Sequence, residues 1–219
     1  MDAAALLRQS ELFGRFPPAA IGALVAGSKR VACARNEDVF AEGDPAADLY
    51  VIESGRVSIS SRAHDGRESM MALMESGDLF GDMGLFDGLG RSAHARSLEQ
   101  SNLLQVPYPA VRACFDAQPE LLWAVVAFLS RRLRVTDTAL ADAMFLDVPA
   151  RTAKRFLELA GAEEQFLLPL TQEELASLVG ASRERVNKAI ASFVRLGWIT
   201  QSGRRYAIVD RPALEDRSR

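Results

Sequence analysis

Hydrophobic residues change their spacing along the chain, and each change predicts a different kind of structure. After a short helical start, FPPAAIGALVAG places Pro17 and Pro18 before an apolar repeat at helical spacing. From about Val31 to Val106 apolar and polar residues alternate, as in LYVIESGRVSIS and SMMALMESGDLF, which is typical of β-strands. Turn signals recur every 11 or 12 residues, at Gly43-Asp44, Ser54-Gly55, Asp65-Gly66 and Ser76-Gly77. We therefore predict an all-β roll or barrel, with Asp65-Gly66 closing a hairpin.

One long helix is predicted after Pro119, because no glycine or proline interrupts the sequence before Pro149. Residues at alternating spacings of three and four form a candidate coiled-coil seam, Leu122, Val125, Leu129, Arg132, Thr136, Ala139 and Ala143. A second apolar stripe is left to pack on the β-domain, Leu121, Phe128, Leu133, Leu140 and Met144. The seam predicts a parallel dimer, and a single wide face packing on its own domain is the alternative. The polar Arg132 and Thr136 need partners, either across a dimer or in a polar ligand beside the helix.

The back half predicts a winged helix-turn-helix. An amphipathic helix, PARTAKRFLELA, is followed by a capping box of Thr171 and Glu174, which begins a helix that Gly180 ends. Ser182 can cap the next helix, which carries several basic residues, and two short helices joined by a glycine turn form this DNA-binding motif. WITQSGRRYAIV then predicts a hairpin with its turn near Ser202-Gly203.

Long polar side chains at the start of the second of these helices suit the reading of base edges. Arginine can bridge O6 and N7 of guanine, and glutamate can accept from N4 of cytosine. Our candidate DNA-contacting residues are Thr171, Ser182, Arg183, Glu184, Arg185, Lys188 and Arg204. Arg204 and Arg205 at the wing tip are predicted to approach backbone phosphates. The alternatives are a charged helix face in water and a solvated hairpin tip.

Composition places the chain among ordinary globular proteins of one or two domains, because 48% of its 219 residues are hydrophobic and 25% are charged. From Val148 onward there are 12 lysines and arginines against nine acidic residues, whereas the preceding segment has a net charge of −6. Only the back half is therefore expected to approach a polyanion. With no 18-residue apolar run and no basic leader, we expect a cytoplasmic protein that does not contact membranes.

Cysteine and histidine placement argues against metal, haem and redox chemistry. Cys33 and Cys114 lack ligand spacing and are expected to be buried free thiols, too few for a four-cysteine iron–sulfur cluster. His64 and His94 are interpreted as turn, surface or strand residues, which opposes a redox or gas sensor. No nucleophile–base pair or phosphate-transfer loop lies outside the predicted domains, so we do not expect an enzyme.

Four segments, taken in order, resemble the cyclic-AMP receptor branch of the CRP/FNR transcription regulators, and the last resembles actinobacterial members most. They are EGDPAADLYVIESGRVSI, FGDMGLFDGLGRSA, RRLRVTD and LTQEELASLVGASRERVNKAI. The resemblance implies an α+β fold: an N-terminal cyclic-nucleotide-binding β-roll (jelly-roll) at 1–117, a dimerisation helix at 118–147 and a winged helix-turn-helix at 148–219. It also implies a homodimer that responds to cyclic AMP, binds palindromic double-stranded DNA and contacts RNA polymerase. Arg183 and Glu184 would read a TGTGA-like half-site, with Lys188 where arginine is also common.

The same resemblance implies a set of ligand-binding residues, Gly81, Asp82, Arg91, Ser92, Ala93, Arg132, Thr136 and Asp137. Arg91 would pair with the cyclic phosphate, an anion that suits a fixed guanidinium and backbone amides. Asp82 stands where the family has glutamate for the ribose 2′-hydroxyl, and Asp137 where serine or asparagine approaches the adenine. These departures leave open constitutive DNA binding or another effector, cyclic GMP or cyclic di-GMP. A structural salt bridge between Asp82 and Arg91 that closes an empty pocket is a further alternative.

Overall fold

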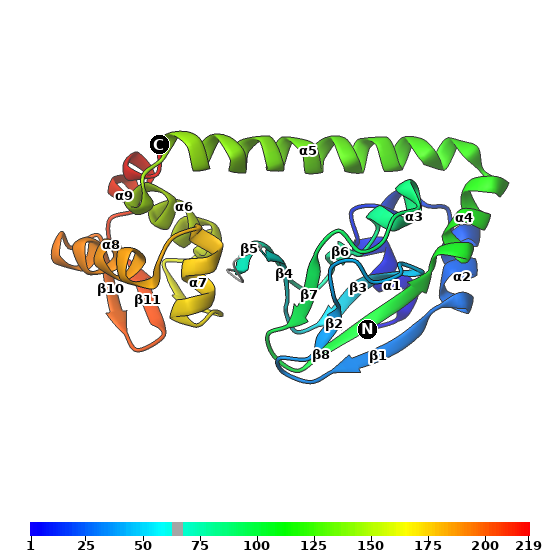
Figure 1. Cartoon of the computed structure of the whole chain (residues 1–219), viewed down its shortest axis with the longest axis horizontal. Helices are drawn as coiled ribbons and strands as arrows, with labels where there is room; N and C mark the ends of the chain where they lie inside the picture. Colours follow the sequence, from blue (N-terminus) through cyan, green and yellow to red (C-terminus); the bar gives the residue numbers. More distant parts are fainter. Residues whose placement is uncertain (63–67) are drawn as a thin grey trace. The chain divides into compact units, whose positions relative to one another are not determined.

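A β-roll of two antiparallel sheets forms most of the first of two compact units, residues 1–133 and 134–219 (Figure 1). The computed structural model describes residues 1–62 and 68–219, so the predicted Asp65-Gly66 turn and His64 lie outside the described residues. Within them, one sheet has the order β1 (Lys29–Cys33), β8 (Ser101–Pro107), β3 (Asp48–Ser54) and β6 (Leu79–Phe80). The other has the order β2 (Asp38–Phe40), β7 (His94–Ser97), β4 (Val57–Arg62) and β5 (Glu68–Met74). The predicted β-roll is confirmed.

The turn between β3 and β4 shows why the predicted glycine is needed there. Gly55 has a φ of +90°, and an added Cβ would lie 2.2 Å from the hydroxyl of Ser101. Ser101 and Ser97 are both buried, and their hydroxyls are hydrogen-bonded to each other at 2.8 Å. A side chain at position 55 would therefore collide with a packed polar contact between neighbouring strands.

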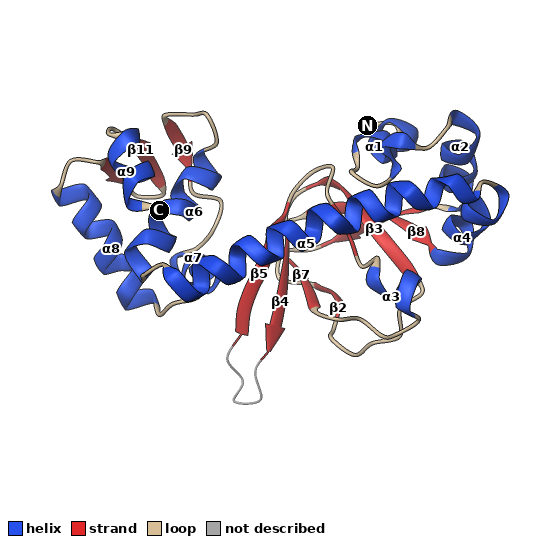
Figure 2. Cartoon of the chain, turned by 90° about the horizontal axis from the view of Figure 1, so that it is seen from above, coloured by secondary structure: helices blue, strands red, loops and turns tan. Residues whose placement is uncertain are grey.

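Helices cover the sheet that contains β3 and β8 (Figure 2). They are α1 (Ala3–Gln9), a 3₁₀ turn (Phe13–Arg15), α2 (Pro18–Gly27) and α4 (Tyr108–Ala117). Our sequence analysis did not identify α4, although Tyr108, Val111 and Phe115 repeat at helical spacing and are buried. The interior of the roll is a second apolar cluster with Cys33 and three aromatic rings. Cys33 and Cys114 are buried free thiols, as predicted, and burial raises the pKa of both.

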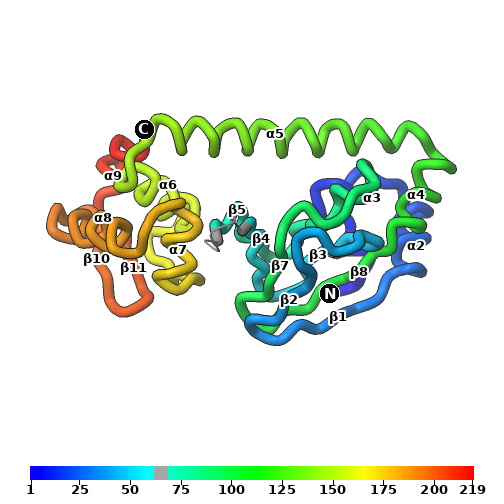
Figure 3. The backbone as a smooth tube through the Cα atoms, in the orientation of Figure 1, coloured from blue at the N-terminus to red at the C-terminus, as the bar shows by residue number. Residues whose placement is uncertain are grey.

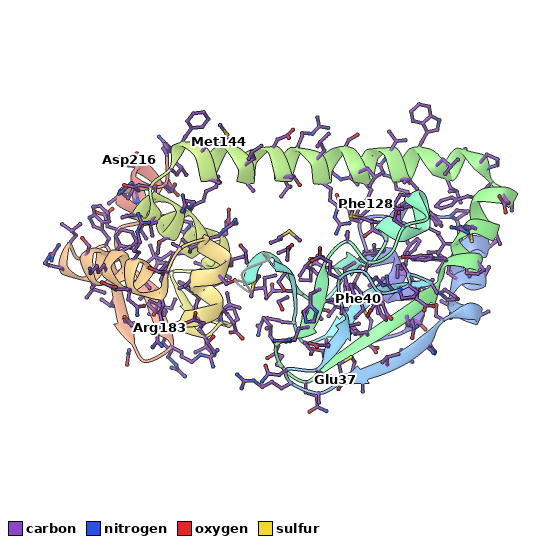
Figure 4. All side chains as sticks on the ribbon, in the orientation of Figure 1. Glu37, Phe40, Phe128, Met144, Arg183 and Asp216 are labelled. Atoms are coloured by element: carbon purple, nitrogen blue, oxygen red, sulfur yellow. The ribbon has the colours of Figure 1, made fainter. Side chains whose placement is uncertain are left out.

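The long helix begins one turn later than predicted and buries a different face. Pro119–Leu121 is a 3₁₀ turn, and α5 runs from Leu122 to Phe145. Phe128, labelled in Figure 4, packs with Leu121 into the core of the first unit, as predicted. Val125, which we had placed on the seam, is also buried there. Leu133, Leu140 and Met144, which we had placed on the β-domain, are at least 60% exposed.

The exposed residues of α5 define a corrected seam, Leu122, Val126, Leu129, Leu133, Thr136, Leu140 and Ala143. Their spacings alternate between four and three, which is the coiled-coil repeat with its phase shifted from our prediction. The shift arises because Phe128 and Val125 must share the buried face. Four other large apolar residues of α5 are also exposed, Trp123, Val135, Met144 and Phe145, but they do not lie on this stripe.

The second unit is the predicted winged helix-turn-helix with additional elements. The chain, traced in Figure 3, forms α6 (Val148–Ala160), β9 (Gln165–Leu167), α7 (Gln172–Val179), α8 (Arg183–Arg195), β10 (Ile199–Ser202), β11 (Arg205–Ile208) and α9 (Arg211–Arg217). The strand β9 joins the wing as a third strand beside β11, and neither β9 nor α9 was predicted. Phe156 and Tyr206 meet edge to face at 5.0 Å in the core. None of the helices in the described part of the chain combines the length and apolarity needed to cross a bilayer.

Candidate ligand pocket and DNA-binding surface

The cassette between β6 and β7 depends on a glycine that lets an arginine approach the backbone. Gly81 has a φ of +75°, and an added Cβ would lie 2.8 Å from Nη1 of Arg91. The segment after Asp82 contains a short helix, α3 (Met83–Asp87), which was not predicted from the sequence. Gly88 ends this helix in the left-handed conformation at φ +71°. The chain then continues to Arg91, whose side chain returns to the backbone of Gly81.

Arg91 is a buried cation whose contacts are to neutral groups. The residue is only 7% exposed. Its Nη1 donates to the carbonyl oxygens of Asp48 at 2.7 Å and Gly81 at 2.9 Å. Among the residues that the structure describes, no carboxylate forms a salt bridge with it. The Nε–H of Arg91 is buried without a hydrogen-bond acceptor. Since a buried charge is costly unless paired, this position favours an anionic ligand.

Asp82 is the buried anion of the pocket, and its partner is Arg132 rather than Arg91. The residue is 1% exposed, and its Oδ1 accepts a 2.6 Å hydrogen bond from Nη1 of Arg132 on α5. Its Oδ2 is buried without a donor. The structure therefore does not contain the Asp82–Arg91 salt bridge that we considered as an alternative. The free lone pairs of Oδ2 suit a hydroxyl group of a ligand.

The other predicted ligand-binding residues differ in how closely they join this pocket. Ala93 is buried just before β7, whereas Ser92 is exposed and its hydroxyl donates to Sδ of Met83 at 3.1 Å. Thr136 and Asp137 are exposed residues of the second unit. Within the first unit, the structure thus brings Gly81, Asp82, Arg91 and Arg132 together, and Ala93 follows two residues after Arg91.

Sequence reasoning missed groups that hold the cassette from distant segments. Tyr108, the first residue of α4, is buried, and its hydroxyl donates to the carbonyl oxygen of Gly81 at 2.5 Å. Burial raises the pKa of this hydroxyl, which therefore stays protonated as a donor. Asp48 contributes through its backbone carbonyl, and Phe40 through its ring, 4.1 Å from the guanidinium carbon of Arg91. No local motif could identify these residues, because they are adjacent only in the folded roll.

The helix-turn-helix has the caps predicted from the sequence. The hydroxyl of Thr171 accepts from the backbone N–H of Glu174 at 3.2 Å, and the Glu174 carboxylate accepts from the N–H of Thr171 at 2.5 Å. Gly180 ends α7 in the left-handed conformation, and Ser182 caps α8 by accepting from the N–H of Arg185. These caps set where the exposed side chains of α8 begin.

The exposed face of α8 carries the residues predicted to read DNA. Arg183, labelled in Figure 4, opens the helix, with Glu184 and Arg185 in the same turn. Lys188 pairs with Glu184 at 2.7 Å, and both side chains are about three-quarters exposed. This pairing lowers the pKa of Glu184, which stays ionised as an acceptor. The opposite face of α8 buries Val186, Ala189, Ile190 and Phe193.

One of the two wing arginines makes a contact that was not predicted from the sequence. The turn at Ser202-Gly203 lies where predicted, with Gly203 at φ +63°. Arg204, however, donates through Nε and Nη2 to the carbonyl oxygen of Leu168 at 3.2 Å and 3.0 Å. In this arrangement Arg204 ties the wing to the segment after β9, and both Arg204 and Arg205 are exposed residues.

A β-roll with a buried arginine that lacks an anionic partner, in a chain that also carries a winged helix-turn-helix, defines a ligand-responsive DNA-binding protein. Residues 30–118 match the family described as the cyclic nucleotide-binding domain, and residues 150–217 match the Crp-like helix-turn-helix domain. A CRP-like cAMP-activated global transcriptional regulator of Mycobacterium tuberculosis is 41% identical over 221 residues, covering 98% of this chain and 99% of that protein. The chain therefore belongs to the CRP/FNR family: it is a cyclic-nucleotide-binding, DNA-binding transcription regulator and not an enzyme.

Solved structures agree with this assignment. CLP of Xanthomonas campestris, described as a c-di-GMP responsive global regulator, is 29% identical with a TM-score of 0.75, covering 88% of this chain and 99% of that one. FixK2 from Bradyrhizobium japonicum is 19% identical with a TM-score of 0.80, covering 88% of this chain and 98% of that one. At that identity the second comparison supports the fold alone.

Proposed function

We propose that the protein is a cyclic-AMP-responsive transcription regulator that acts as a homodimer on palindromic DNA. The observation that carries this proposal is the pair of unsatisfied buried atoms in one cassette, the donor Nε of Arg91 and the acceptor Oδ2 of Asp82. A cyclic phosphodiester beside a ribose 2′-hydroxyl supplies an anionic acceptor and a donor, which are the groups these two atoms need. The cAMP-activated mycobacterial relative supports the choice of ligand.

A second candidate effector is cyclic di-GMP, which also presents cyclic phosphodiester groups. CLP of Xanthomonas campestris is described as responsive to it. Asp82 departs from the family pattern, because it is one methylene shorter than the usual glutamate. Its Oδ1 also accepts from Arg132, so the contact to a ribose hydroxyl must be made through Oδ2. Titration calorimetry with cyclic AMP, cyclic GMP and cyclic di-GMP, each on the full chain, tests these alternatives. Tight binding of cyclic AMP alone supports the proposal, and binding of cyclic di-GMP alone would replace it.

The corrected seam of α5 supports the homodimer. Leu122, Val126, Leu129, Leu133 and Leu140 are each at least 40% exposed in the single chain, although all are large and apolar. Burying such a stripe against a second copy contributes about 25 cal/mol for each Å² removed from water. Its four-three spacing is that of helices packing as a coiled coil, and we propose a parallel pair. This arrangement would pair two DNA-binding units, as a palindromic site requires.

The DNA-reading residues are proposed on the α8 face. Arg183 and Glu184 lie in the first turn of a helix whose other face is buried, so their side chains are available to base edges. Arg185 and Lys188 extend the basic surface toward backbone phosphates. Such a regulator works in the cytoplasm, and we expect it to contact RNA polymerase at promoters.

Replacing Glu184 by alanine should relax sequence discrimination more than it weakens binding. Loss of one base contact is expected to reduce the affinity ratio between the cognate half-site and a variant that lacks the cytosine contacted by Glu184 by about 10-fold, the scale of one lost base-specific contact. Competition binding with single-position variants of the half-site measures this ratio. Glu173→Ala, which removes an exposed acid from α7, is the matched control. Full discrimination by Glu184→Ala would contradict the assignment.

A further inference from the structure

The phosphate-binding candidate, Arg91, lies on an aromatic platform. Its guanidinium carbon is 4.1 Å from the centre of the Phe40 ring and 5.7 Å from that of Tyr50. Phe40 contacts both Tyr50 and Phe80 with ring centres 6.0 Å apart, and Tyr50 stacks on Phe80 at 5.3 Å. Figure 4 labels Phe40 among the strands of the roll. Phe40 is thus the ring of this cluster nearest to the guanidinium.

A β-bulge brings Phe40 to this position. In the pairing of β2 with β7, Asp38 lies opposite Arg96, but Phe40 lies opposite Ala95, so β2 contains one extra residue. Such a bulge changes the direction in which the following side chain points. Ala95 is fully buried in the roll interior, and its small side chain leaves room for a ring opposite it. Phe40 also approaches Gly81, where an added Cβ would lie 3.3 Å from its Cε1.

The platform and the carbonyl contacts restrain Arg91 in different ways. The carbonyl oxygens of Asp48 and Gly81 and the hydroxyl of Tyr108 all accept from Nη1, so these contacts hold only one end of the guanidinium and rotation about that end must be limited by other groups. The face of Phe40 limits this rotation, and cation–π attraction is strongest where the cation is desolvated, as Arg91 is. An arginine ordered before the ligand arrives loses less side-chain entropy on binding. The buried Nε–H then remains available to a ligand oxygen.

We propose that Phe40 is a positioning residue for phosphate recognition: its ring holds the Arg91 guanidinium in the orientation that binds a cyclic phosphodiester. The proposal rests on the proposed function, because the ligand is a cyclic nucleotide. The new element is that affinity for the cyclic nucleotide depends on an aromatic ring at position 40. Phe40 lies outside the cassette motif and supplies neither a charge nor a polar atom.

Calorimetry with cyclic AMP on full-length variants tests the effect on binding. Phe40→Leu keeps an apolar side chain and removes the π face, so we expect affinity to fall about 10-fold. Phe40→Tyr restores the ring and should bind within about twofold of the wild type. Phe80→Leu is the matched control, because it disrupts the same aromatic cluster without facing Arg91. We expect it to lower the melting temperature while leaving affinity nearly unchanged.

The orientation of Arg91 can be measured without any ligand. The Nε–H resonance of Arg91 in ¹⁵N-labelled protein is assigned by its loss in Arg91→Lys, and the Phe40 ring current shifts it upfield. Phe40→Leu should move this resonance downfield, whereas Phe80→Leu should leave it nearly in place. Wild-type affinity in Phe40→Leu, or an unmoved resonance, would overturn the proposal.

The two measurements separate this inference from the proposed function. If the wild-type protein binds none of the cyclic nucleotides, the proposed function fails, and so does any role of Phe40 in binding them. If the wild type binds cyclic AMP and Phe40→Leu binds as tightly, only the role of Phe40 fails. An equal loss of affinity in Phe80→Leu would show that general packing of the roll, rather than the platform, is responsible.

Discussion

Replacing Arg91 by alanine should weaken cyclic-AMP binding by at least about 100-fold. The substitution removes the guanidinium whose Nε–H is buried without an acceptor in the free protein, and with it the charge-assisted contacts to the phosphate. Each such contact contributes about 1.5 to 3 kcal/mol, and two of them correspond to a factor of 100 or more. Titration calorimetry on the full chain measures the change.

Controls are needed because Arg91 also supports the fold. Its loss leaves the carbonyl oxygen of Asp48 without the donor seen at 2.7 Å, which by itself destabilises a buried region by about 1 to 3 kcal/mol. Melting curves and the variant Arg91→Lys, which keeps the charge but not the planar fork, separate folding from recognition. Arg96→Ala is the matched control, because Arg96 lies on β7, the strand that follows Arg91, and pairs with the half-exposed Asp38. Wild-type affinity in folded Arg91→Ala would contradict the proposed site.

Placing aspartates on the corrected seam should convert the protein to a monomer and abolish binding to a palindrome. In Leu129→Asp/Leu133→Asp, each chain puts two carboxylates where the dimer would bury leucines, and burying unpaired charges costs several kcal/mol. Both positions are well exposed in the single chain, so its own fold should tolerate the change. Light scattering at micromolar concentration measures the mass, and band shift with a palindromic site measures DNA binding.

Ala141→Asp is the matched control for this prediction, because Ala141 is an exposed residue of α5 that is not a seam position. We expect it to remain dimeric and to bind DNA. A dimeric mass for the seam variant would show that another surface joins the two copies. A monomeric wild type would refute the homodimer itself.

The ligand cassette shows how far a motif can predict a site. The resemblance of FGDMGLFDGLGRSA to the CRP/FNR family implied a site for a cyclic phosphate, and the structure brings Gly81, Asp82 and Arg91 together. Their pairing was not predictable, because Arg132 approaches Asp82 from a helix 50 residues away in the sequence. Phe40 and Tyr108 join the cassette from other segments for the same reason. A local pattern contains no information about such approaches.

The long helix shows a similar division. Its existence follows from an uninterrupted helical sequence, but the phase of its seam does not. Two overlapping stripes fit the same sequence, and only packing of Leu121, Val125 and Phe128 on the roll decides which one remains exposed. The same holds for Arg204. Its place in the wing turn follows from the local sequence, whereas its contact with Leu168 depends on the pairing of β9 with β11.

By itself, the sequence determined the properties that depend on neighbours along the chain. Periodicity, capping boxes and glycine turns specify the roll, the long helix and the helix-turn-helix, because hydrogen bonding and side-chain direction within an element are local. Only the tertiary structure decided the partner of Asp82, the phase of the α5 seam and the ring beneath Arg91. These three features depend on burial and on contacts between segments that are distant in the sequence. The linear pattern is compatible with several such contacts, and only packing in three dimensions selects one.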